Sequence, residues 1–212
     1  MKNLLYKELN LSIHKFYFIL PIILGALMFI PYWIYSFVFM YFFWITIPQV
    51  FGSYNSNQDY NFIGALPVER KDIVNSKAMS IFILELLHVL FALVFGSIHN
   101  WVYEIYNPFL DINLTFFGVG IGMFGVFNVI FLPLYFKTAH FFGKPLIYAN
   151  IAILIYGFIF EFGAIRYQWV RDLLEGSFTS QILPFTLLTL MGVLLSLLAV
   201  KLSQMNFSKL DI

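Results

Sequence analysis

The stretch that decides the fold is MSIFILELLHVLFALVFGS, residues 79–97, in which Glu85 and His88 are the only ionisable side chains. About 20 predominantly apolar residues are enough to cross the hydrocarbon core of a bilayer as an α-helix. The whole chain has this character, since 61% of its 212 residues are hydrophobic and 11% are charged, where soluble domains carry about 25% charge. The sequence therefore predicts an integral membrane protein.

Further apolar segments lie on both sides of this stretch. Pro31 separates the first two, and a long polar loop at 51–78 separates the second from residues 79–97. Roughly six spans of about 20 residues account for nearly the whole length, which leaves no room for a soluble catalytic domain. The expected fold is a single all-α domain, 1–212, with six transmembrane helices. The other five spans are expected at 16–30, 32–50, 116–136, 146–162 and 183–200.

Positive charge is unevenly distributed between the connections. Ten of the twelve Lys and Arg residues lie in the N-terminus, the 51–77 loop, the 137–145 loop and the C-terminus. The remaining connections carry only Arg166 and Arg171, and the 98–115 loop has no cation. Because cytoplasmic loops are enriched in Lys and Arg, we expect both termini inside, which agrees with an even number of spans. The expected location is a bacterial cytoplasmic membrane.

Residues 1–15, MKNLLYKELNLSIHK, combine several Lys residues with an apolar stripe at Leu5, Leu9 and Ile13. This spacing predicts an amphipathic helix. Glu8 interrupts the apolar core that a secretory signal would need, so the segment is expected to remain on the protein. We expect it to lie in the membrane interface with its Lys side toward the lipid headgroups.

Two polar side chains and two glycines within the spans are candidates for function or packing. Glu85 and His88 lie one helical turn apart, and ionisable residues at membrane depth indicate a functional role by default. They fit a satisfied hydrogen bond, a polar element of a transport route, or half of a carboxylate-bridged metal site that would need a second copy of the motif. Gly118 and Gly122 form G-x-x-x-G, which predicts close approach of a neighbouring helix. The overlapping G-x-G-x-x-G at 120–125 lies inside a span, so it does not predict a nucleotide site.

The 51–78 loop contains LPVERKDIVNSKA, residues 66–78. Pro67 suits the first turn of a helix, and the mixed charged and apolar residues after it predict a short helix outside the membrane over 67–74. An ordinary solvated loop helix is the alternative. The sequence contains no G-x-x-x-x-G-K-[ST], so any use of ATP would require a partner protein.

The order of these parts resembles the small ABC-2 type permeases, the membrane subunits of bacterial ABC exporters, over essentially the whole chain. Residues 1–15 are similar to the amphipathic first helix of that family. Residues 66–80, LPVERKDIVNSKAMS, resemble its Leu-Pro-x-x-Arg-x-x-Ile-Val pattern after the second span. Within the family, the chain is similar to the permeases that export phenol-soluble modulins, which are amphipathic peptides.

This resemblance implies a dimer, formed with a second copy or with a related permease, and two ATPase subunits on the cytoplasmic face. ATP and Mg²⁺ would bind to the ATPase, and this chain would hold no cofactor of its own. Residues 67–74 would dock into the ATPase as a coupling helix, and 164–181 would form an extracellular re-entrant pair of short helices, or else a simple interfacial connection. The coupling residues would be Pro67, Val68, Glu69, Arg70, Lys71, Asp72, Ile73 and Val74, with polar contacts from 70–72 and packing from Val68, Ile73 and Val74.

The expected function is therefore export of an amphipathic or hydrophobic substrate, a peptide or a lipid-like molecule, driven by a separate ATPase. The 27 Phe, 13 Tyr and 4 Trp residues favour aromatic lining of any inner surface. A membrane-embedded binding or immunity protein without transport is the alternative. An enzyme acting on lipid is disfavoured, because no carboxylates or histidines converge on one face, and the net charge of +1 does not suit a nucleic-acid partner.

Overall fold

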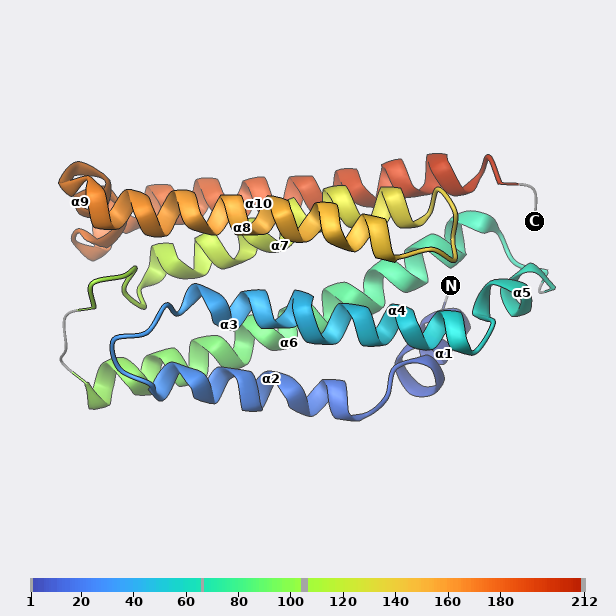
Figure 1. Ribbon diagram of the computed structural model, residues 1–212, viewed down its shortest axis with the longest axis horizontal. Coiled ribbons are helices and arrows are strands. Elements are labelled where there is room, and N and C mark those ends of the chain that lie inside the picture. Colours follow the sequence, from blue (N-terminus) through green and yellow to red (C-terminus); the bar gives the residue numbers. More distant parts are fainter. Residues whose placement is uncertain (1, 66, 104–106, 211–212) are drawn as a thin grey trace.

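The computed structural model describes residues 2–65, 67–103 and 107–210. Within these residues all regular structure is helical, and the long helices run roughly along the long axis of the molecule (Figure 1). This confirms the expected all-α class. Five helices are long and apolar enough to cross a membrane, and a sixth span results if a bent pair near the N-terminus is counted as one.

The helices extend beyond most of the expected spans by several residues. Ser36–Ser56 is one continuous helix that contains a π-helical segment, and the helix that includes residues 79–97 has 33 residues. In chain order the elements are α1 (Lys2–Lys7), η1 (Glu8–Ser12), α2 (Phe16–Ala26), η2 (Leu27–Phe29), α3 (Ser36–Tyr41), η3 (Phe42–Thr46), α4 (Ile47–Ser56), α5 (Asp59–Gly64), α6 (Arg70–Val102), α7 (Leu114–Tyr135), α8 (Gly143–Arg166), α9 (Gln168–Glu175) and α10 (Phe178–Phe207).

The first expected span is the shortest. α2 and η2 contribute 11 and 3 residues, which rise about 21 Å at 1.5 Å per residue. The hydrocarbon core is about 30 Å thick. The preceding helical segment, Lys2–Ser12, meets Phe16–Phe29 at 68°. The N-terminus therefore forms a helix that turns across the end of the bundle, as the amphipathic pattern predicts.

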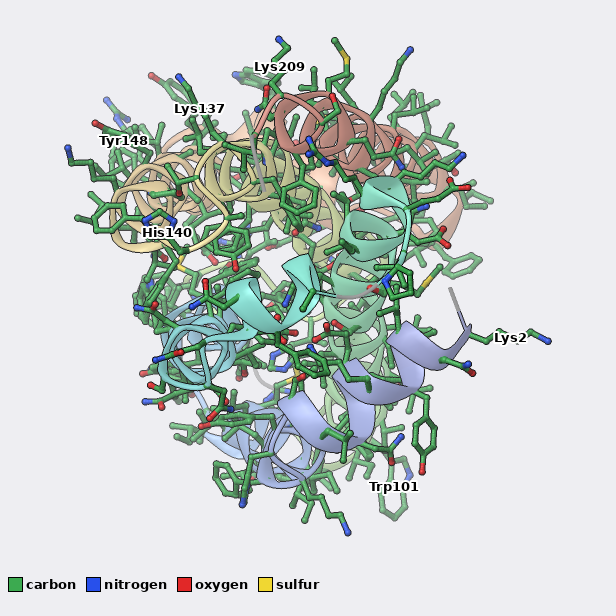
Figure 2. The ribbon with its side chains drawn as sticks, turned by 90° about the vertical axis from the view of Figure 1, so that its right-hand side faces the viewer. Lys2, Trp101, Lys137, His140, Tyr148 and Lys209 are labelled. Carbon is green, nitrogen blue, oxygen red and sulfur yellow. The ribbon has the colours of Figure 1, made fainter. Side chains whose placement is uncertain are left out.

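The Lys-rich connections gather at one end of the bundle. Figure 1 shows both termini and α5 at this end, whereas α9 lies at the opposite end. Figure 2 looks onto the first end, where Lys2, Lys137 and Lys209 project outward. The arrangement agrees with an even number of passes, and the side of the membrane that this end faces stays a prediction.

The bundle has two groups of packed helices, and aromatic side chains of η3 and α7 pack in its interior. α2 packs against α6, whereas α7 packs mainly against α10 and α8. The ring of Phe43 in η3 stacks on Phe127 of α7 with centroids 4.2 Å apart, and Phe127 stacks on Phe131 at 5.1 Å. All three rings are fully buried. Aromatic pairs of this kind stabilise contacts beyond the area that they bury.

Glycines allow α7 and α10 to approach at backbone distance. A Cβ at Gly118 would lie 3.0 Å from the Cα of Phe185, and one at Gly125 would overlap the backbone of Gly192. A Cβ at Gly122 would meet the Tyr156 hydroxyl of α8. The close partners of these glycines in α7 are therefore helices of the same chain.

Substituting Gly125 by Ala should destabilise the protein by about 1–3 kcal/mol, because the added methyl group meets backbone and cannot be relieved by a rotamer change. Gly52→Ala is the matched control, since the nearest atom to its Cβ is the Phe142 ring at 3.9 Å. Thermal unfolding of the purified protein in detergent measures both. Equal unfolding temperatures for the two variants would contradict the close crossing of α7 and α10.

Candidate functional site

The connection between the second and third spans differs from its predicted form. Residues 67–69 are not helical, and α6 runs without a break from Arg70 to Val102. The prediction of a separate short helix over 67–74 is therefore wrong. No Pro or Gly occurs between Pro67 and Gly96, so nothing interrupts the hydrogen-bond ladder between the loop and the span. The separate short helix in this connection is α5; Leu66 lies outside the described residues.

The predicted coupling side chains divide into buried and exposed sets. Ile73 and Val74 are buried inside the bundle, so they are not available to pack against a partner as expected. Arg70 Nη1 donates to the carbonyl oxygens of Ser208, at 2.9 Å, and of Leu210, which ties the start of α6 to the end of the chain. Val68 also packs against the core, and Asp72 is half-buried. The exposed members are Pro67, Glu69 and Lys71, of which the last two pair at 2.8 Å.

An exposed aromatic side chain lies on α5 in the same connection. Phe62 is 54% exposed at the Lys-rich end of the bundle. The Lys7 ammonium lies 5.8 Å from the centroid of its ring, within cation–π range. Phe62 on α5 and the Glu69–Lys71 pair just before and in the first turn of α6 are exposed parts of the same connection, and we refer to these three residues together as the α5 surface.

Asp59, the first residue of α5, belongs to a cluster of four charged side chains, in which Glu8, Asp59 and Lys77 are buried and Lys7 is half-buried. The carboxylate of Asp59 accepts hydrogen bonds from both Lys7 and Lys77. Glu8 Oε1 lies 3.2 Å from the Lys7 ammonium and 3.6 Å from that of Lys77. Lys77 also lies over the ring of Tyr54 at 3.3 Å from its centroid. Two cations and two anions balance, as burial of charge requires.

This cluster joins the N-terminal helix, α5 and the start of α6. It also corrects the expectation that the Lys side of residues 1–15 faces the lipid headgroups, because Lys7 points inward to Asp59 while Lys2 projects outward (Figure 2). The cluster was missed from the sequence. One signal was available: Lys77 shares a helical face with the apolar residues Ile73 and Ile81, and that pattern places it on the buried side.

The charges around Asp59 change its acidity. Burial by itself raises the pKa of the Asp59 carboxyl, but the ammonium groups of Lys77 and Lys7 outweigh it and hold that pKa below its usual range. Asp59 therefore stays ionised in the folded protein to a lower pH than in the unfolded chain.

At mid-span, Glu85 and His88 are both buried but do not bond to each other. Glu85 Oε2 accepts a hydrogen bond of 3.1 Å from Asn128 Nδ2, which also donates to Ser196 Oγ at 3.3 Å. His88 Nε2 instead lies 2.7 Å from the carbonyl oxygen of Val38. The one-turn spacing therefore brings the two residues to different neighbours. No group of three His, Asp or Glu side chains suited to a metal ion occurs in the part of the chain that the structure describes.

The opposite end of the bundle is closed by polar contacts around Arg171. Its Nε donates to Glu175 at 2.6 Å and its Nη2 to the carbonyl oxygen of Asn107 at 2.6 Å. The Glu161 carboxyl group accepts hydrogen bonds from the Ser36 hydroxyl and from the backbone N–H of Leu110. Burial raises the pKa of the Glu175 carboxyl. The expected pair of short helices over 164–181 is a single short helix, α9, between the ends of α8 and α10.

Removing one charge from this cluster should lower the stability of the folded protein. Asp59→Asn or Lys77→Met should each destabilise the protein by about 3–5 kcal/mol, because each leaves an uncompensated buried charge. The double variant again contains equal numbers of positive and negative charges in the cluster. Its loss of stability should therefore be smaller than the sum of the losses of the two single variants. Lys71→Ala, at an exposed ion pair, is the control and should leave the thermal unfolding temperature unchanged. Additive losses would show that the two side chains do not interact.

The depressed pKa of Asp59 also predicts a pH dependence. Its ion pairs stabilise the folded state above the unfolded carboxyl pKa of about 3.9. This contribution is lost as the pH falls through the lower folded pKa. Thermal unfolding measured at decreasing pH should therefore show a steeper loss of stability below about pH 4 in the native sequence than in Asp59→Asn. If the unfolding temperatures of the two proteins fall with pH in parallel, Asp59 is not the source of the pH dependence.

Comparison with known proteins identifies a family for the chain. The model of the ABC-2 family transporter protein matches residues 3–208. Among curated proteins and among solved structures, no match was found. The match confirms the resemblance at the family level, whereas the likeness to modulin exporters stays a prediction. Because the match covers nearly the whole helical bundle, this chain belongs to the ABC-2 family of transporter permeases.

Proposed function

We propose that this chain is the membrane subunit of an exporter that moves an amphipathic or hydrophobic substrate out of the cytoplasm, using ATP and Mg²⁺ bound by a separate ATPase. Its family membership supports the permease role. The observation that carries the proposal is the α5 surface, which exposes Phe62 and Lys71 at the end where both termini lie. This end is the cytoplasmic one in our proposal, because it also carries most of the Lys and Arg residues.

The docking element in this proposal is the α5 surface, in place of a helix over 67–74. Phe62 offers an apolar group that can enter a pocket on the ATPase, and aromatic residues commonly dominate such interfaces. Glu69 and Lys71 lie on the same connection and are exposed, so they provide polar contacts around it. Ile73 and Val74 are buried in the first turns of α6 and anchor that helix in the bundle.

Movement of the docking element would reach the spans through the buried charge cluster. Asp59 is the first residue of α5, Lys77 lies in α6, and Lys7 and Glu8 lie in the N-terminal helix. Separating any of these elements would leave a charge unpaired in a buried environment. A displacement of α5 by the ATPase is therefore passed to the N-terminal helix and the start of the third span together.

The complete exporter would contain two permeases, as a homodimer or with a related permease, and two ATPase subunits in a lipid bilayer. α9 and the polar contacts around Arg171 would lie on the extracellular side. A membrane-embedded binding or immunity protein without transport is the competing function. The presence of an ATPase partner distinguishes the two, because only the exporter needs one.

Phe62→Ala should weaken ATPase binding about 30-fold, the loss of roughly 2 kcal/mol typical of a central aromatic residue at an interface. Phe141→Ala is the matched control, because Phe141 is also exposed, at 48%, in the next connection at the same end of the bundle. Lys71→Glu should reduce binding further when combined with Phe62→Ala. Purification from native membranes, with mass spectrometry to identify and quantify the copurifying ATPase, measures these effects.

Recovery of an ATPase at one copy per permease, reduced by Phe62→Ala and unchanged by Phe141→Ala, is the expected result. Equal recovery with both variants would place the docking surface elsewhere. Recovery of the native chain without an ATPase would favour the binding or immunity role.

A further inference from the structure

A groove open to the surrounding lipid lies between α6, α7 and α10, beside the polar group centred on Glu85. Its volume is about 330 Å³, within the range of small-molecule sites. Most of its surface is apolar. Its lining includes the apolar side chains of Phe82, Phe124 and Leu197 and the polar side chains of Glu85, Thr189 and Ser196.

Two polar atoms of the groove residues have no hydrogen-bond partner among the described residues. Asn128 occupies one oxygen of Glu85, but Oε1 of this 7% exposed residue is unpaired, and so is the buried hydroxyl of Thr189. A buried acceptor without a partner costs about 1–3 kcal/mol. The carboxyl oxygen can accept a hydrogen bond, and the hydroxyl can accept one or donate one, so a ligand that donates hydrogen bonds can satisfy both atoms.

The depth of these atoms argues against a lipid headgroup as the donor. Glu85 lies near the middle of α6, and Thr189 and Ser196 lie in the middle third of α10. The centre of a spanning helix is about 15 Å from either edge of the hydrocarbon core. A lipid lying in the groove would therefore place acyl chains beside Glu85, and these carry no donor.

Charge also restricts the ligand. Within the described ranges, no Lys, Arg or His side chain forms an ion pair with Glu85. The His88 ring instead lies against the carbonyl oxygen of Val38. Ionisable groups at membrane depth are normally paired. An ammonium group supplies three donors and the charge that would balance an ionised carboxyl, whereas a carboxylate or phosphate group has no donor to offer Glu85 Oε1.

We propose that this groove binds the transported molecule through an alkyl or aromatic group that bears a primary amine. The amine donates to Glu85 Oε1 and to the hydroxyl of Thr189, while Phe82, Phe124 and Leu197 surround the apolar part. Asn128 and Ser196 position the carboxyl group. This assignment names the substrate class of the exporter proposed above and rests on that proposal.

The test uses dodecylamine as the probe, with the permease in nanodiscs of phosphatidylcholine, a lipid without a primary amine. The chain contains no Cys, so a Leu194→Cys variant can carry one environment-sensitive fluorophore at an exposed position of α10 next to the groove residue Val193. Titration should give a saturable change in fluorescence. Dodecyltrimethylammonium keeps the chain length and charge but has no N–H donor, and it should bind at least tenfold more weakly.

Two variants test the polar contacts separately. Glu85→Gln should reduce dodecylamine affinity at least tenfold. Asn128 would still donate to the amide oxygen of Gln, so the amide NH₂ would take the place of Oε1 and offer the amine a donor where it needs an acceptor. Thr189→Val removes the hydroxyl, preserves the shape, and should reduce affinity severalfold. A fluorophore at Ile155→Cys, on the groove between α3 and α8, is the control for partitioning of the probe into the bilayer.

Equal titrations at both fluorophore positions, or affinities unaffected by either variant, would overturn the assignment. Competition by phosphatidylethanolamine added to the nanodiscs would show that a lipid amine fills the groove, which also overturns it. The experiment contains no ATPase. Failure of amine binding is therefore separate from failure of the exporter proposal, which the ATPase recovery tests.

Discussion

A charged side chain that is buried in a protein has lost its contact with water, so an opposite charge or a hydrogen-bond partner within the protein must compensate for it. The arrangement of this bundle depends on that constraint. At one end, Asp59 lies between two lysines, and at the other Arg171 is held by Glu175 and by backbone carbonyl oxygens. These contacts hold short elements that have little apolar surface of their own, so both ends of the bundle are ordered by polar pairing and its middle by apolar packing.

This division has a consequence for transport. The buried cluster at the Lys-rich end joins three elements that are far apart in sequence, so that end responds as a unit to a force on α5. The middle of the bundle is mainly apolar, and Glu85 has an oxygen without a hydrogen-bond partner beside a groove there. In the function that we propose, the charged end receives the movement of the ATPase and the polar group at mid-span contacts the substrate.

Part of the candidate site followed from local pattern and part did not. The surface-exposed Lys71 and the buried positions of Glu85 and His88 agree with their hydropathy context. The prediction of a separate short helix over 67–74 was wrong, because Pro67 indicates where a helix can begin but does not indicate where that helix ends. Residues 70–74, which we expected in a separate short helix, are the first residues of the 33-residue helix α6. The short helix of this connection, α5, lies before them in the chain.

By itself, the sequence determined the membrane class, the helical architecture and the approximate position of each span, because these depend on runs of neighbouring apolar residues and on the length needed to cross a bilayer. Only the tertiary structure decided which polar groups meet. Lys7 reaches Asp59 across 52 positions of the chain, and Glu85 bonds to Asn128 rather than to His88 one turn away. Such pairs are set by how the helices pack and rotate against one another, and no local pattern encodes that.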